Sequence, residues 1–197
     1  MIIIVRHGQT FWNVLKKLQG HKNSKLTAKG KKQALRVAKF LNRRIENYEK
    51  FKIYSSPIKR VIDYTNVINT NLVNKKIKKK IIYSDYLKEH NFGKWEGKSI
   101  KEIKKKFPAE FQNREDDKWN FRVPNGESYS ILNERIKKFL RKKIIRNEKY
   151  IIFTHEMVSK VLRGILLNLK KEKTMKLKHN SDYLFIYENK KFKKIKI

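Results

Sequence analysis

The chain opens with the stretch Met1-Ile2-Ile3-Ile4-Val5-Arg6-His7-Gly8, in which an apolar run ends on two basic side chains. A short, uninterrupted apolar run of this kind is typical of a fully buried strand. A second such run, Tyr150–Thr154, ends on His155 in the same way. In open α/β sheets, ligands bind in the crevice outside the carboxyl ends of the strands. We therefore expect His7 and His155 to face one crevice at this edge of a sheet.

Strands and helices are predicted to alternate along the rest of the chain. Further strands are expected at Lys52–Ser55 and Ile81–Tyr83, and a closing hairpin at Tyr183–Tyr187 and Phe192–Ile197. Two helices are expected from their apolar faces: one from about Thr27, with Ala34, Ala38, Leu41 and Ile45 on that face, and one after His155, with Val158 to Leu169. Three more are expected from their N-terminal signals, which are the N-cap Ser56 with Pro57, the capping box Ser99 and Glu102, and the N-cap Ser128. This order predicts an α/β three-layer sandwich with a mostly parallel central sheet flanked by helices. No repeat or linker divides the sequence, so residues 1–197 are predicted to form a single domain.

The composition excludes several classes of protein. There are no cysteines, which rules out disulfides, thiolate-bound zinc and a thiol nucleophile. The N-terminal apolar run is shorter than the roughly 7–15 residues of a signal-peptide core. No stretch approaches the ~18 apolar residues that indicate a membrane span. We therefore expect a soluble cytoplasmic protein with no membrane partner.

The chain is strongly basic, with 51 Lys and Arg against 18 Asp and Glu and a formal net charge of +33. Nucleic-acid-binding proteins show such an excess, because Lys and Arg neutralise phosphates. Here the excess is mostly lysine and is spread over the whole chain together with abundant Ile and Asn. We interpret it as a drift in composition, with nucleic-acid binding as the alternative. In both cases the positive electrostatic field of the protein favours anionic substrates.

Two arginines are predicted to share the crevice with the two histidines. Arg6 directly precedes His7, and Arg60 lies in the first turn of the helix that follows Lys52–Ser55. The planar forks of arginine suit the oxygens of a phosphate group. Gly8 is expected to leave room for a ligand to approach the backbone. Together these residues predict an anion site.

Six blocks of sequence carry a further pattern. They are Arg6-His7-Gly8-Gln9-Thr10-x-x-Asn13; Gln19-Gly20 with Leu26-Thr27-x-x-Gly30; Ser55-Ser56-Pro57-x-x-Arg60; Leu87-x-Glu89-x-x-Phe92-Gly93-x-Trp95-Glu96-Gly97; Gly126-Glu127-Ser128; and Thr154-His155. In this order they resemble the motifs of the histidine phosphatase superfamily, the phosphoglycerate mutase-like proteins. The first triplet alone is a weak signal, but the ordered set is specific. The resemblance implies a phosphoglycerate mutase-like fold.

The resemblance also implies a role for each site residue. His7 would be the nucleophile that is phosphorylated, Glu89 would protonate the leaving oxygen, and Arg6, Arg60 and His155 would hold the phosphate. Substrate contacts are expected from Gly8, Asn13, Gln19, Gly20 and Glu156. No metal and no other cofactor is expected, because side-chain cations oppose the charge of the transferring phosphoryl group.

Three sites depart from the family pattern. Glu156 stands where the family usually has glycine, and Tyr64 stands where threonine is common, with Thr65 one residue later. Asn23 and Lys25 replace the usual Asp and Pro of the early loop. None of these changes removes a catalytic group, but a carboxylate at position 156 repels an anionic substrate unless it points away. Because of these departures, the resemblance does not identify the substrate.

We predict a metal-independent phosphatase that hydrolyses a small phosphorylated metabolite through phosphohistidine at His7. One alternative is a phosphoglycerate mutase, although family mutases usually carry extra segments and the chain has little room for them between Glu96 and Pro124. Another alternative is a basic, non-catalytic module that binds RNA or acidic partners. The presence of His7, Glu89 and His155 argues against this alternative. The segment Phe107 to Val123 is predicted to be irregular and to determine substrate specificity, but its sequence does not identify the substrate. Whether the chain forms a homo-oligomer stays open.

Overall fold

The computed structural model describes residues 1–44, 50–72 and 81–197. Within these residues, six strands form one sheet in the order β3-β2-β4-β1-β5-β6. Their bounds are β1 Ile2–Arg6, β2 Phe51–Ser55, β3 Ile81–Tyr83, β4 Lys149–Thr154, β5 Tyr183–Glu188 and β6 Lys191–Lys196. Strands β3, β2, β4 and β1 are parallel, and β5 and β6 are antiparallel to their neighbours. The prediction of a mostly parallel sheet is confirmed.

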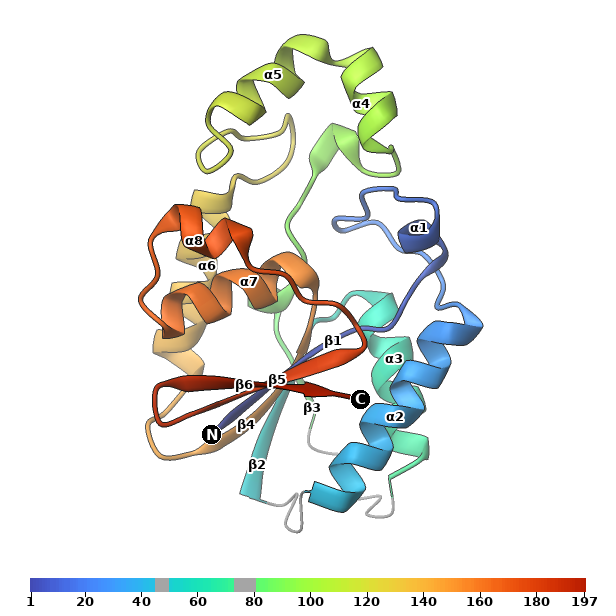
Figure 1. Cartoon of the computed structure of the whole chain (residues 1–197), viewed down its shortest axis with the longest axis vertical. Helices are drawn as coiled ribbons and strands as arrows, with labels where there is room; N and C mark the ends of the chain where they lie inside the picture. Colours follow the sequence, from blue (N-terminus) through green and yellow to red (C-terminus); the bar gives the residue numbers. More distant parts are fainter. Residues whose placement is uncertain (45–49, 73–80) are drawn as a thin grey trace.

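Helices cover both faces of this sheet (Figure 1). The described α-helices are α1 Phe11–Val14, α2 Ala28–Arg44, α3 Lys59–Thr70, α4 Ile100–Lys106, α5 Pro108–Asp116, α6 Tyr129–Lys143, α7 Glu156–Leu166 and α8 Lys171–Lys176. In Figure 1, α2 and α3 lie on one side of the sheet and α6, α7 and α8 on the other, while α4 and α5 lie at the top. The predicted three-layer arrangement is confirmed. Over the described part of the chain, no helix has both the length and the apolar character to cross a bilayer.

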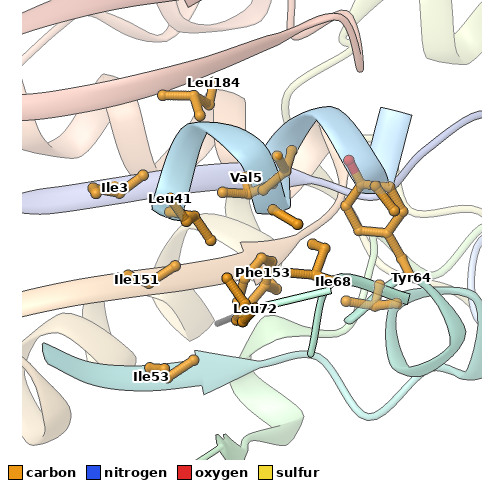
Figure 2. Packing of buried hydrophobic residues seen from close by; sticks show 14 of the residues in the cluster. Ile3, Val5, Leu41, Ile53, Tyr64, Ile68, Leu72, Ile151, Phe153 and Leu184 are labelled. Atoms are coloured by element: carbon orange, nitrogen blue, oxygen red, sulfur yellow. The ribbon is translucent and has the colours of Figure 1, made fainter. Parts of the chain in front are cut away.

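Alternate residues of each strand supply two separate cores, because successive strand side chains point to opposite faces. In β1, Ile3 and Val5 pack with Leu41 of α2 and with Tyr64 and Ile68 of α3 (Figure 2). The intervening residues of the same strand face α6 and α7. A strand buried on both faces needs apolar side chains at every position. This requirement explains the uninterrupted apolar run at the start of the sequence.

A third cluster lies under α4 and α5. Trp95 and Ile103 are fully buried there, and Phe111 packs against them. Phe111 belongs to α5, so the prediction that the segment Phe107 to Val123 is irregular is wrong for Pro108–Asp116 and holds for residues 117–123. Pro108 opens this helix at its first turn, where a missing N–H costs little.

Two helix ends also differ from prediction. Helix α3 begins at Lys59 with Ile58 as N-cap, so Ser56 is not its cap. The Ser56 hydroxyl instead lies 2.8 Å from Nε2 of His155. Helix α7 ends at Leu166, because the left-handed backbone of Asn168 (φ 50°) stops it before Leu169. The predicted caps of α4 and α6 are confirmed, whereas Ile45 lies outside the described residues.

Candidate active site

Strands β1 and β4 bring the two predicted histidines together. The strands pair in parallel with Arg6 opposite Thr154, so His7 and His155 follow paired residues at the carboxyl edge of the sheet. Both side chains are buried, and their ring centroids lie 5.2 Å apart. The two imidazoles thus lie together at this edge, as predicted, but only His7 lines the cavity there, so the expectation that both face one crevice is confirmed for His7 alone.

The ring of His7 is held in one tautomer. Its Nδ1 lies 2.7 Å from the carbonyl oxygen of Gly8. Since a carbonyl can only accept, Nδ1 carries the proton and Nε2 keeps its lone pair. Burial lowers the pKa of His7 well below 6.5, and the charges of Arg60 and Arg6 lower it further. His7 is therefore neutral near pH 7, with Nε2 unprotonated, as a nucleophile requires.

The guanidinium of Arg60 is buried against this nitrogen. Its Nε donates to Nε2 of His7 at 3.2 Å, while Nη1 and Nη2 donate to the carbonyl oxygens of Lys22 and Gly20 at 2.7 and 2.8 Å. Its backbone N–H donates to Oδ1 of Asn23 at 2.8 Å. Burial lowers the pKa of Arg60 to about 10, which leaves it charged at neutral pH. The structure thus holds a fixed cation beside the atom that would attack phosphorus.

Glu89 places a carboxyl group in the same cavity as His7. Its Oε1 accepts from the backbone N–H of His90 at 2.9 Å, and its Oε2 accepts from that of Met157 at 3.4 Å. Burial raises the pKa of Glu89 above its usual value, although the His90 N–H and the two arginines oppose the rise. A carboxyl group that keeps its proton more readily suits a general acid.

The cavity that joins these groups has a volume of about 110 Å³. It is lined by Arg6, His7, Asn13, Lys17, Leu18, Gln19, Gly20, Arg60, Glu89, Phe92, Glu156 and Met157. Of the five predicted substrate contacts, four are in this lining and Gly8 is not. His155 also lies outside the lining, with its ring centroid 5.2 Å from that of His7.

Gly8 does not line the cavity, and the structure gives a reason for glycine at this position other than the expected access of a ligand to the backbone. A Cβ at this position would come within 2.4 Å of the carbonyl oxygen of Gly30. Glycine is therefore required here by the close approach of the loop to α2. Its contribution to the site is the carbonyl oxygen that binds His7.

Two buried polar atoms beside His7 have no hydrogen-bond partner among the described residues. They are Nε of Arg6 and Nδ1 of His155. Buried polar groups are normally paired, and an unpaired one calls for an explanation. Of the two residues, only Arg6 lines the cavity, so its Nε is the one that suits an oxygen of a bound anion.

Glu96 is a site residue that the sequence reasoning did not single out. Its Oε1 accepts from the backbone N–H groups of His21 and Phe92 at 2.8 and 3.2 Å, and its Oε2 accepts from that of Lys22 at 3.1 Å. It thereby fixes the loop whose carbonyl oxygens bind Arg60. The signal was present, because Glu96 belongs to the same sequence block as Glu89.

Replacement of Arg60 by alanine is expected to lower kcat/KM by about 10²–10³-fold, the usual cost of losing one preorganised donor. Arg60→Lys keeps the charge but not the fork, so we expect it to recover only part of the loss. The exposed Arg43→Ala is the matched control for a lost positive charge. Equal rates in Arg60→Ala and Arg43→Ala would remove Arg60 from the site.

The buried histidines are expected to make the fold sensitive to acid. Burial lowers the pKa of His179 to about 3 and that of His90 to about 4, and it lowers those of His7 and His155 well below 6.5. The unfolded chain protonates histidine near pH 6.5, so below this pH it binds more protons than the folded chain does, and stability falls. His90 and His179 should each cost roughly 2 kcal/mol at pH 5. The raised pKa of Glu89 has the opposite effect on stability, because the folded chain then binds this proton more readily than the unfolded chain.

The measurement is the melting temperature between pH 7 and pH 5. We expect a steep fall for the wild type and a shallower fall for His179→Gln. Parallel profiles for the two proteins would contradict this account.

The fold and the site define an α/β protein with a pocket lined by His7, Arg6 and Arg60 at the carboxyl edge of its sheet. The family model described as "Histidine phosphatase superfamily (branch 1)" matches residues 2–194. The chain belongs to the histidine phosphatase superfamily, as its motifs predicted.

Curated relatives of the chain include phosphatases. It is 28% identical over 179 residues to 6-phosphofructo-2-kinase/fructose-2,6-bisphosphatase 1 of Mus musculus, a match that covers 90% of this chain and 35% of that protein. It is 29% identical over 170 residues to phosphoserine phosphatase 1 of Hydrogenobacter thermophilus, covering 85% of this chain and 76% of that one. The chain thus spans about a third of the length of the first relative and about three quarters of the second.

Solved structures share the fold. The alpha-ribazole phosphatase from Shigella flexneri superposes with a TM-score of 0.82 at 18% identity, over 100% of this chain and 95% of that one. Bacillus stearothermophilus YhfR superposes with a TM-score of 0.77 at 24% identity, over 98% and 93% of the two chains. At these identities the likeness establishes the fold alone.

Proposed function

We propose that the protein is a metal-independent phosphatase that hydrolyses a small phosphomonoester through a phosphohistidine intermediate on His7. The observation that carries the proposal is the geometry of His7, whose Nδ1 is bound to the Gly8 carbonyl and whose Nε2 lies 3.2 Å from Nε of Arg60. Membership of the superfamily and the phosphatases among the relatives support it.

In the first half-reaction, Nε2 of His7 attacks phosphorus. A bond forms between Nε2 and phosphorus, and the bond from phosphorus to the ester oxygen breaks. Glu89 gives its proton to that oxygen, so a neutral alcohol leaves. Arg6 and Arg60 oppose the negative charge of the transferring group. The Nδ1 proton stays on the ring, held by Gly8.

In the second half-reaction, water attacks the phosphohistidine. The Glu89 carboxylate, left by the first step, accepts a proton from the water. The bond between Nε2 and phosphorus breaks, inorganic phosphate is released, and His7 returns to its neutral form. Glu89 thus serves as acid and then as base.

Activity is expected to survive EDTA, and vanadate should inhibit by occupying the phosphoryl position. The positive charge of the site comes from side chains, and the described ranges contain no group of three or more His, Cys, Asp or Glu residues arranged to hold a metal ion. The measurement is phosphate release before and after chelation. Activity lost with EDTA and restored by a divalent metal would contradict metal independence.

A screen of phosphorylated metabolites tests the proposal as a whole. It should measure both phosphate release and isomerised product, and we expect steady phosphate release. Isomerised product that depends on 2,3-bisphosphoglycerate would instead indicate a mutase. Salt-dependent RNA binding without phosphoryl transfer would favour a basic binding module. A cytoplasmic location and a single domain over residues 1–197 stay predictions.

A further inference from the structure

Glu156 connects the phosphoryl site to its surroundings. It opens α7 directly after His155, and its Oε2 lies 3.0 Å from Nη1 of Arg6. Its Oε1 lies 3.6 Å from Nζ of Lys160. The side chain is 27% exposed. The carboxylate therefore points toward the phosphate-binding arginine, and not away from the site.

The ion pair between Arg6 and Glu156 forms a common wall of two cavities. Both residues line the cavity of His7, and both line a neighbouring cavity of about 280 Å³. The second cavity also contains Lys29, Lys178 and Asp182. A leaving group that extends past Arg6 on either side of this wall meets the carboxylate of Glu156.

Glu156 also lies close to the proposed proton donor. The next residue, Met157, donates its backbone N–H to Oε2 of Glu89 at 3.4 Å. The charge of Glu156 contributes to the raised pKa of Glu89. The leaving oxygen must lie beside Glu89 to receive its proton. The charge of Glu156 therefore acts where the leaving group departs.

Arg6 and Lys160 balance Glu156 before a substrate binds. A phosphoryl group bound by Arg6 adds negative charge beside the ion pair of Arg6 and Glu156, so Arg6 then interacts with two anions. A positive charge on the leaving group would offset the excess, and a further negative charge would increase it. The net charge of +33 attracts polyanions in general. A carboxylate in the lining of both cavities acts against that preference locally.

We propose that Glu156 determines specificity by the charge of the leaving alcohol. It favours a phosphomonoester whose alcohol carries an ammonium group, and it disfavours one whose alcohol carries a carboxylate or a second phosphate. This proposal rests on the phosphatase function proposed above.

Three small substrates of similar shape test the proposal on the full chain. They are 2-aminoethyl phosphate with an ammonium group, propyl phosphate with no charge, and 2-phosphoglycolate with a carboxylate. For Glu156→Gln we expect the kcat/KM ratio of aminoethyl to propyl phosphate to fall about tenfold relative to the wild type. The ratio of phosphoglycolate to propyl phosphate should rise by a similar factor, which is the size expected for unit charges several ångströms apart near a surface. Ratios between substrates cancel any general loss of activity.

Glu188→Gln is the matched control, because it removes the same charge from an exposed residue at the opposite end of the sheet. It should leave both ratios unchanged, and Glu156→Asp, which keeps the charge, should keep the wild-type order. If Glu156→Gln does not fold, Glu156→Gly removes the same charge. Ratios within about twofold of the wild type in either neutral variant would overturn the proposal. Absence of phosphate release by the wild type from all three substrates and from p-nitrophenyl phosphate would instead overturn the phosphatase function.

Discussion

Replacement of His7 by alanine is expected to lower kcat for phosphate release by at least about 10⁴-fold, as for other removed nucleophiles. The remaining pocket can still bind a phosphate through Arg6 and Arg60, but among the described residues no other imidazole nitrogen accepts a hydrogen bond from Arg60. The melting temperature should change little, because a side chain at a strand end contributes little of the core. KM should change less than kcat, since most phosphate-binding groups remain.

The direct measurement is rapid-quench trapping with a ³²P-labelled substrate. We expect one labelled peptide, containing His7, with the acid-labile and base-stable linkage of a phosphohistidine. His7→Ala should carry no label. Substantial turnover or labelling of that variant would exclude the proposed intermediate.

Replacement of Glu89 by glutamine is expected to slow transfer from alkyl phosphates by roughly 10²–10⁴-fold and to leave aryl phosphates such as p-nitrophenyl phosphate nearly unaffected. An alkoxide leaves poorly unless it is protonated, whereas nitrophenolate leaves readily as an anion. Glutamine keeps the size of the side chain but cannot donate a proton as the carboxyl can. The comparison requires conditions in which phosphorylation of His7 limits the rate, because both substrates share the second step.

The pH dependence provides a second readout for Glu89. The acid must be protonated in the first step, and burial raises its pKa, so alkyl phosphate turnover should fall as pH rises through that pKa. Glu89→Gln should lose this alkaline limb, while the exposed Glu188→Gln should keep it. Equal slowing of both substrate classes would mean that Glu89 binds or orders the pocket. No slowing of either would place the acid elsewhere, with Glu156 the next residue to test.

The sequence by itself determined the sheet and the composition of the site. Ile2–Arg6 and Tyr150–Thr154 are uninterrupted apolar runs because both faces of their strands are buried. That pattern is local, and it places His7 and His155 at the carboxyl edge without further information. The six motif blocks identified the family for the same reason, since each lies within a short stretch of chain.

Local signals were misleading where a tertiary contact competed with them. Ser56 has the sequence context of an N-cap, as Ser99 and Ser128 do, but its hydroxyl contacts His155, which is 99 positions away. The polar composition of α5 concealed a helix that packs on the third cluster through Phe111. The ring centroid of Phe111 lies 6.4 Å from that of Trp95.

Only the tertiary structure decided how the site is organised. The need for glycine at position 8 comes from the carbonyl oxygen of Gly30, and the loop around Arg60 is held by Glu96, which lies 75 positions beyond His21. The direction of the Glu156 carboxylate follows from its 3.0 Å contact with Arg6. These properties depend on distances between residues far apart in the chain and on how deeply each is buried. A sequence records the identity of the groups, whereas their protonation states and orientations arise only when the fold brings them together.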